Sequence, residues 1–294
     1  MNDNELIKKI KEYEFYHDIQ LKEGISTKSF KVGDRLTYHG VRCSSKENMA
    51  YVDRENINYK NKRVLDIGCR DGLFSFEAEK RGASEVIGID NNISKGVVEF
   101  LIPHFKSKIK MLQKNLYEIT SKDFGKMDIV LFFGVLYHLR YPFYALKVIK
   151  ELLKQDSILI IETAIYLDDN KRALLYCPIE SEGEFEKTSC TFFNVKALED
   201  TLKSMGILIV KKEIRVQKIK FRIVKNIIRF VLRTIFRKDK VFGIKTAHFK
   251  KYDQAVGENI GPVSRGIFIC KLNNKSIDEE TLNYWDTYHK LHTP

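Results

Sequence analysis

Glycine and acidic residues follow two apolar segments of the chain at spacings that suit ligand binding. The run Arg63–Ile67 is followed by Gly68-Cys69-Arg70-Asp71-Gly72, and Asp66 stands just before the first glycine. Glycine lets the turn between a strand and a helix approach a ligand closely. Asp90 closes the next apolar run, 18 residues after Gly72, where a carboxylate can accept both hydroxyls of a ribose. The pattern predicts a nucleoside-binding turn, although the glycines alone would also suit an ordinary tight turn.

A second cluster, Gly134-Val135-Leu136-Tyr137-His138-Leu139-Arg140, follows a third apolar run, Asp128–Phe133. Side chains at this end of a strand in a parallel sheet face the ligand crevice. Because a histidine titrates near neutral pH, His138 is a candidate general base, with Tyr137 beside it as the second catalytic candidate. The alternative is that His138 only caps a helix or bonds a carbonyl while Tyr137 packs in the core.

Strands that alternate with helices must position these two clusters. The expected strands are 63–67, 85–90, 108–112, 128–133, 157–162, 207–212 and 266–271, and the expected helices are 73–81, 142–153 and 195–205. This order predicts an α/β fold with a mostly parallel sheet and helices on both faces.

The motif VLDIGCRDG (64–72), with GID at the end of the next strand, resembles motif I and the acidic loop of class I S-adenosylmethionine-dependent methyltransferases. The resemblance implies a seven-stranded Rossmann-like sheet and S-adenosylmethionine as cofactor. It places Asp66 near the methionine part, Asp90 on the ribose, and Asn115-Leu116 near the adenine. Arg70 replaces the middle glycine of the family motif, so its side chain is expected to point away from the cofactor. The cofactor-binding candidates are Asp66, Gly68, Cys69, Arg70, Gly72, Asp90, Asn91, Asn115, Leu116 and Gly134.

The segment GVLYHLRYP (134–142), with FYHDI (15–19) and GIST (24–27), resembles the subfamily that includes the enzyme forming 5-(carboxy)methoxyuridine at the tRNA wobble position. Two elements of that tRNA enzyme are missing: a W-R-S-x-W-K-W segment before motif I, and an R-R-T-x-W-M tail. Their absence favours ordinary S-adenosylmethionine and O-methylation of a small-molecule or sugar-type acceptor. The alternatives are a tRNA wobble-uridine modifying enzyme and a non-catalytic cofactor-binding protein.

The N-terminal Tyr16 and His17 suit a lid that excludes water from the site, or else they only anchor the N-terminal arm to the core. No metal site is expected. The residues expected to face the substrate are Tyr16, His17, Lys28, Arg140 and Glu162.

The chain of 294 residues carries a net charge of +12, and this excess is local. Residues 211–251 hold 15 Lys and Arg against two acids, so the remainder is close to neutral. If residues 217–237 are helical, their basic residues form one stripe beside a wide apolar face. Three interpretations stay open: a helix packed on the core, a helix lying on anionic lipid, or a phosphate-binding patch for RNA.

These patterns also give expectations for domains and location. Residues 1–60 are expected to form an arm or lid, 61–215 the cofactor-binding core, 216–262 a basic amphipathic helical insertion, and 263–294 the last core strand with a tail. The five cysteines are scattered without a C-x-x-C pair, which is typical of reduced thiols. We expect a cytoplasmic protein, peripheral on the inner face of the membrane if the basic helix binds lipid.

Overall fold

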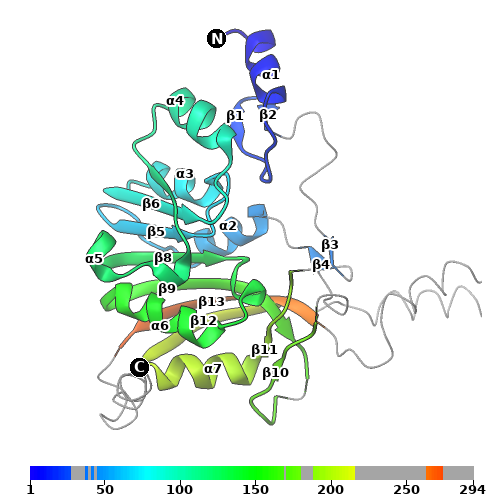
Figure 1. Ribbon diagram of the computed structural model, residues 1–294, viewed down its shortest axis with the longest axis vertical. Helices are drawn as coiled ribbons and strands as arrows, with labels where there is room; N and C mark the ends of the chain where they lie inside the picture. Colours follow the sequence, from blue (N-terminus) through cyan, green and yellow to red (C-terminus); the bar gives the residue numbers. More distant parts are fainter. Residues whose placement is uncertain are drawn as a thin grey trace, which may run out of the picture.

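The computed structural model describes residues 1–27, 37–38, 41–42, 45–168, 170–179, 188–215 and 263–273, with only the backbone at 37–38 and 41–42. Nine strands form the central sheet, in which seven lie side by side in the order β12-β13-β9-β8-β5-β6-β7 (Figure 1). These are β12 (Ile207–Arg215), β13 (Val263–Leu272), β9 (Leu153–Tyr166), β8 (Met127–Phe133), β5 (Arg63–Ile67), β6 (Glu85–Asp90) and β7 (Lys110–Gln113). Only β13 runs antiparallel to its two neighbours in this run. The predicted Rossmann-like, mostly parallel sheet is confirmed.

Helices cover both faces of the sheet because successive strand residues point to opposite sides. Val130 and Phe132 of β8 pack with α6 and α7, whereas Ile129 and Leu131 pack with α2 and α3. The longer helices are α1 (Asp3–Lys11), α2 (Ser45–Arg54), α3 (Leu73–Lys80), α6 (Pro142–Leu152) and α7 (Val195–Ser204). The shorter elements are β1 (Gln20–Lys22), β2 (Ile25–Ser26), β3 (Thr37–Tyr38), β4 (Val41–Arg42), η1 (Val97–Leu101), α4 (Ile102–Phe105), η2 (Leu116–Glu118), α5 (Ser121–Phe124), η3 (Leu136–His138), β10 (Leu175–Tyr176) and β11 (Phe192–Asn194).

The strand order reverses at β5, which lies between β6 and β8. The loops after β5 and β8 therefore leave toward opposite faces of the sheet and open a crevice at its carboxyl edge. Both clusters picked out in the sequence follow strands at this edge.

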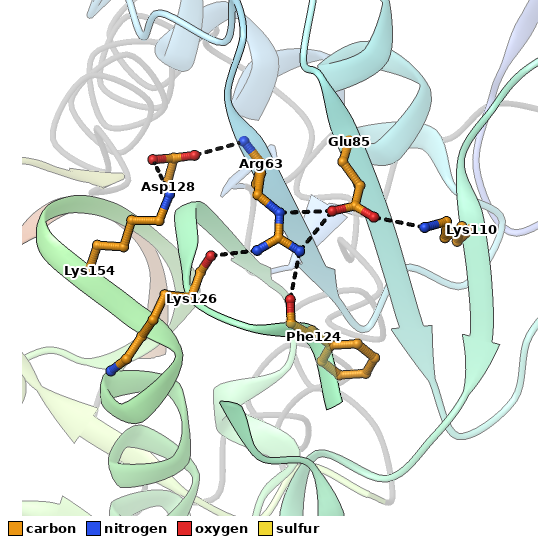
Figure 2. A network of polar contacts seen from close by, with 7 residues as sticks. All are labelled: Arg63, Glu85, Lys110, Phe124, Lys126, Asp128 and Lys154. Carbon is orange, nitrogen blue, oxygen red and sulfur yellow. Dashed lines mark hydrogen bonds and ion pairs between the residues drawn. The ribbon is translucent and has the colours of Figure 1, made fainter. Parts of the chain in front are cut away.

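The amino ends of the strands carry a different arrangement, a network of charged side chains (Figure 2). Glu85 accepts from Arg63 Nε at 2.8 Å and from Lys110 Nζ at 2.7 Å. Asp128 accepts from the Arg63 backbone at 2.9 Å and from Lys154 Nζ at 2.8 Å. The hydrogen bonds from Lys110 and Arg63 hold the pKa of Glu85 below its usual value. The network joins β5, β6, β7, β8 and β9 at the end of the sheet opposite the crevice.

Most predicted elements are present, with two clear differences. Helix α2 is not among the expected elements: it lies within residues 1–60, the expected arm or lid, and it buries polar Ser45 and Asn48 as well as Tyr51 and Val52. Strand β9 extends from Leu153 to Tyr166 rather than over 157–162, because its far end continues to pair with β13.

The predicted basic helix at 217–237, the insertion 216–262, Lys28 and Cys43 lie outside the described residues. Among the residues that are described, no helix is both long and apolar enough to cross a membrane.

Candidate functional site

A cleft of about 590 Å³ opens at the carboxyl edge of the sheet. Most of the residues chosen from the sequence line it: Tyr16, His17, Gly68, Arg70, Asp90, Asn91, Asn115, Leu116, Gly134, Tyr137, His138 and Glu162. Four others do not line it: Asp66, Cys69, Gly72 and Arg140. The cleft therefore brings together residues from the ends of β5, β6, β7, β8 and β9 and from the N-terminal arm.

The turn after β5 depends on two glycines in the left-handed backbone region, each with φ of +78°. A Cβ on Gly68 would lie 2.3 Å from Val135 Cγ2, and one on Gly72 would lie 2.4 Å from Met111 Cε. Gly68 thus keeps the cleft wall close to the loop after β8. Gly72 does not line the cleft; its left-handed backbone favours glycine there, whereas the Met111 methyl is the end of a flexible side chain that could move.

Arg70 adopts a left-handed conformation with φ of +48°, which costs a non-glycine residue about 1 kcal/mol. Its backbone N–H donates to Asp90 Oδ2 at 3.0 Å, and its guanidinium donates to the Asn92 carbonyl at 2.8 Å. The side chain is thus directed along the loop after β6, although it still forms part of the cleft wall. Asn92 N–H also donates to Asp90 Oδ1 at 2.8 Å. Because a carboxylate has about four acceptor positions, Asp90 keeps capacity for ribose hydroxyls.

Two motif residues lie beneath the turn rather than at the cleft. Asp66 is 1% exposed and accepts from Ser75 Oγ at 2.7 Å. Burial, which penalises the charged carboxylate, raises the pKa of Asp66 to about 7. Cys69 packs its sulfur 3.5 Å from the sulfur of Met111. Both side chains support the turn from behind.

The catalytic candidates lie on η3. The rings of Tyr137 and His138 are 4.1 Å apart, and His138 Nδ1 is 3.1 Å from Thr188 Oγ1. The Tyr137 carbonyl accepts from the backbone of Cys190 at 2.9 Å and of Thr191 at 3.1 Å. If Nδ1–H donates to Thr188, the other ring nitrogen carries a lone pair and can accept a proton. The segment that begins at Thr188 thus orients the imidazole.

Glu162 lines the cleft as a member of a buried ion pair. Arg265 on β13 donates to its carboxylate from Nε at 2.7 Å and from Nη2 at 2.5 Å, and the two residues are 1% and 6% exposed. The guanidinium carbon of Arg265 also lies 4.6 Å from the centre of the Tyr137 ring. Sequence reasoning chose Glu162 but missed Arg265. The available signal was a lone arginine in the otherwise apolar run VSRGIFIC.

The N-terminal arm reaches the cleft through Asp71, a residue of the glycine turn that sequence reasoning also missed. Asp71 Oδ2 accepts from the backbone N–H of Tyr16 and, at 2.7 Å, from that of His17. Thr27 Oγ1 donates to the His17 carbonyl at 2.6 Å and accepts from the Ile19 N–H at 2.9 Å. Asp71 is 1% exposed, so its carboxylate is enclosed between turn and arm.

Replacing Asp71 with alanine is expected to release the arm. Hydrogen bonds to a charged group contribute ~1.5–3 kcal/mol each, so a net loss of about 2 kcal/mol would raise the open fraction roughly thirtyfold. Limited proteolysis within residues 1–27 measures this change. The control is Asp53→Ala on α2, which removes an exposed ion pair between Asp53 and Arg81. Equal cleavage of the two variants would show that Asp71 does not hold the arm.

Arg140 does not line the cleft and is exposed, as is the next residue, Tyr141, which is 70% exposed. Two polar residues that the sequence did not suggest, Ser45 and Asn48 of α2, line the cleft instead.

Comparison with known proteins identifies the class. A family model described as a methyltransferase domain matches residues 45–212, and the chain belongs to this family. The family uses S-adenosylmethionine, so the cofactor predicted from the motif at 64–72 is confirmed at the level of the family.

The curated relatives include tRNA U34 carboxymethyltransferases. Those of Helicobacter pylori (strain Shi470) and Helicobacter acinonychis (strain Sheeba) are 29% and 31% identical over 152 and 150 residues. Each match covers 50% of this chain and 56% of the relative. The chain thus spans about half the length of the curated relatives it matches.

Two solved structures show the same fold at low sequence identity. The N-terminal domain of EvdMO1, with S-adenosylhomocysteine and D-fucose, is 14% identical with a TM-score of 0.56, over 93% of this chain and 98% of that chain. The cyclase SpnF is 12% identical with a TM-score of 0.52, over 82% and 88% of the two chains. At these identities the likeness concerns the fold alone.

The residues that line the cleft offer groups suited to S-adenosylmethionine. Gly68 lines the cleft without a side chain, because a Cβ there would overlap Val135, and the Asp90 carboxylate stands at the end of β6. Asn115 lines the same wall, with its Oδ1 occupied by the Tyr117 N–H at 3.0 Å.

Proposed function

We propose that the protein transfers a methyl group from S-adenosylmethionine to an oxygen of a small-molecule or sugar-type acceptor. One observation carries this proposal: His138 lines the cofactor cleft with its Nδ1 beside Thr188. Methylation of a hydroxyl requires removal of a proton as the oxygen attacks, and an oriented imidazole supplies a suitable base. In this proposal residues 1–27 serve as arm and lid, while α2 packs on the sheet as part of the core.

In this proposal the residues of the cleft have separate roles. S-adenosylmethionine, when bound, supplies an electrophilic methyl group on a sulfonium sulfur. Gly68, Asp90 and Asn115 would hold and orient it, while Tyr16 and His17 would exclude water. His138 would accept the proton that the acceptor hydroxyl loses when its oxygen takes the methyl group. Positioning of the two reactants in line supplies much of the rate enhancement.

Replacing His138 with glutamine tests this assignment. Glutamine retains hydrogen bonding but cannot act as a base, so kcat for methyl transfer is expected to fall by about 10²–10⁴-fold. The affinity for S-adenosylhomocysteine, measured by calorimetry, should not change. The rise in rate with pH that an imidazole base produces should disappear.

The matched control is Thr188→Val, which leaves the imidazole but removes its Nδ1 partner and should cause a smaller loss. A His138→Gln enzyme with unchanged kcat would contradict the role of His138. Absence of S-adenosylhomocysteine binding by the unaltered protein would contradict the function itself.

A second candidate is modification of the tRNA wobble uridine. It is favoured by the curated relatives and by the segments at 15–27 and 134–142. This function requires binding to tRNA with an affinity that falls steeply with salt, because Lys and Arg would displace counterions from phosphates. Methyl or carboxymethyl transfer to unmodified tRNA would support this candidate over the small-molecule acceptor.

A further inference from the structure

The first turn of α2 presents two buried polar side chains to the cleft. Ser45 and Asn48 are three residues apart, so they lie on the same face of the helix. They are 9% and 5% exposed, and both line the cleft. Polar side chains buried to this degree normally have hydrogen-bond partners. Among the described residues, the hydrogen bond of this pair is the one that Asn48 Oδ1 accepts from Arg215, and neither the Ser45 hydroxyl nor the Asn48 amide nitrogen has a partner.

Arg215 at the end of β12 determines how the Asn48 amide faces. Its Nη2 donates to Asn48 Oδ1 at 2.7 Å. Because a guanidinium only donates hydrogen bonds, the amide oxygen must face Arg215 and the NH₂ group must face elsewhere. Asn48 lines the cleft, so its NH₂ group, which Arg215 does not engage, is the part of the amide left to donate to a ligand there. Arg215 is itself largely buried, with 11% of its side chain exposed.

Two of the three cations near this wall have acidic partners: Arg265 is paired with Glu162 at 2.5 Å and Lys46 with Asp18 at 3.0 Å. Arg215 only approaches Glu213 at 4.0 Å, and its buried Nη1 has no hydrogen-bond partner among the described residues, but Arg215 does not line the cleft. The groups that Ser45 and Asn48 offer are uncharged. An acceptor with neutral oxygens suits such a wall better than a phosphate or a carboxylate, which usually meets Arg or Lys.

We propose that Ser45 and Asn48 form the acceptor-recognition wall of the cleft, with Arg215 as the residue that positions Asn48. The ligand class is a neutral, polyhydroxylated molecule of the sugar type, whose hydroxyl and ring oxygens accept from Asn48 and exchange hydrogen bonds with Ser45. This inference rests on the proposed methyl transfer to such an acceptor, and it names the residues that select that acceptor.

The experiment measures binding of D-fucose, a neutral monosaccharide, to the full chain saturated with S-adenosylhomocysteine, by ligand-observed NMR. Ser45→Ala and Asn48→Leu are each expected to weaken binding about three- to tenfold, the effect of one lost hydrogen bond. Arg215→Met should weaken it to a similar degree by releasing the amide. Ser121→Ala, at the first residue of α5, is the matched control and should have no effect. All four variants should retain wild-type affinity for S-adenosylhomocysteine.

If Asn48→Leu fails to fold, Ser45→Ala still tests the inference, because it removes a hydroxyl while Arg215 keeps its hydrogen bond to Asn48. Failure of D-fucose to bind up to its solubility limit, or equal binding to wild type and Ser45→Ala, would overturn the inference. Tighter binding of glucose 6-phosphate than of D-fucose would overturn the neutral class of ligand. Loss of S-adenosylhomocysteine binding in the wild type would instead count against the proposed function.

Discussion

Replacing Arg265 with methionine is expected to destabilise the protein by ~3–5 kcal/mol, because it leaves the buried Glu162 without its counterion. Glu162 is 1% exposed and receives two hydrogen bonds from Arg265. Removal of one partner strands a charge where water cannot solvate it. Methionine has a comparable length, so the loss of packing should be small. Urea denaturation followed by circular dichroism measures the change.

The double variant Arg265→Met/Glu162→Leu separates the charge effect from the loss of packing. Removal of both charges should restore much of the stability lost in the single variant, since buried ion pairs contribute little over an apolar pair. The rate of methyl transfer by the double variant should be lower than that of the wild type, because the Tyr137 ring loses the cation 4.6 Å from its centre. A single variant within about 1 kcal/mol of wild type would contradict the pairing seen here.

Replacing Asp90 with alanine is expected to lower the affinity for S-adenosylhomocysteine by at least a hundredfold. A hydrogen bond to a charged group contributes ~1.5–3 kcal/mol, and two ribose hydroxyls would lose their acceptor together. The same substitution also removes the oxygens that receive the backbone N–H groups of Arg70 and Asn92. The loop that forms this wall should therefore loosen as well. Isothermal titration calorimetry gives the affinity directly.

Two controls accompany Asp90→Ala. Asp90→Asn retains one acceptor oxygen and should bind with intermediate affinity. Asn91→Ala changes a neighbouring residue that also lines the cleft and should have a much smaller effect. An affinity of Asp90→Ala within threefold of wild type would show that Asp90 does not bind the ribose.

The residues at the cleft that sequence reasoning identified belong to local patterns. Gly68 and Asp90 each end or follow a strand that is itself legible as an apolar run. His138 lies in the cluster after the next such run. Because parallel strands end at one edge of the sheet, their order along the chain was sufficient to predict that they meet. Where strands and helices alternate regularly, patterns within short segments of the sequence are therefore enough to predict which residues meet at the site.

The residues that were missed depend on contacts between distant parts of the chain. Asp71 meets Tyr16 across 55 residues, Arg265 meets Glu162 across 103, and Arg215 meets Asn48 across 167. No periodicity links such pairs, because each partner is placed by a different element. Helix α2 was missed for a related reason, since the side chains it buries include serine and asparagine.

The contact of Asp71 with the arm has a kinetic consequence. Asp71 belongs to the glycine turn and holds the backbone of Tyr16 and His17, two residues that line the cleft. A ligand that steadies the turn must also favour the docked arm, and by reciprocity the docked arm must favour retention of that ligand. With the proposed function, we expect departure of S-adenosylhomocysteine to wait for the arm to lift. Release of the product, rather than the chemical step, would then limit the rate of turnover.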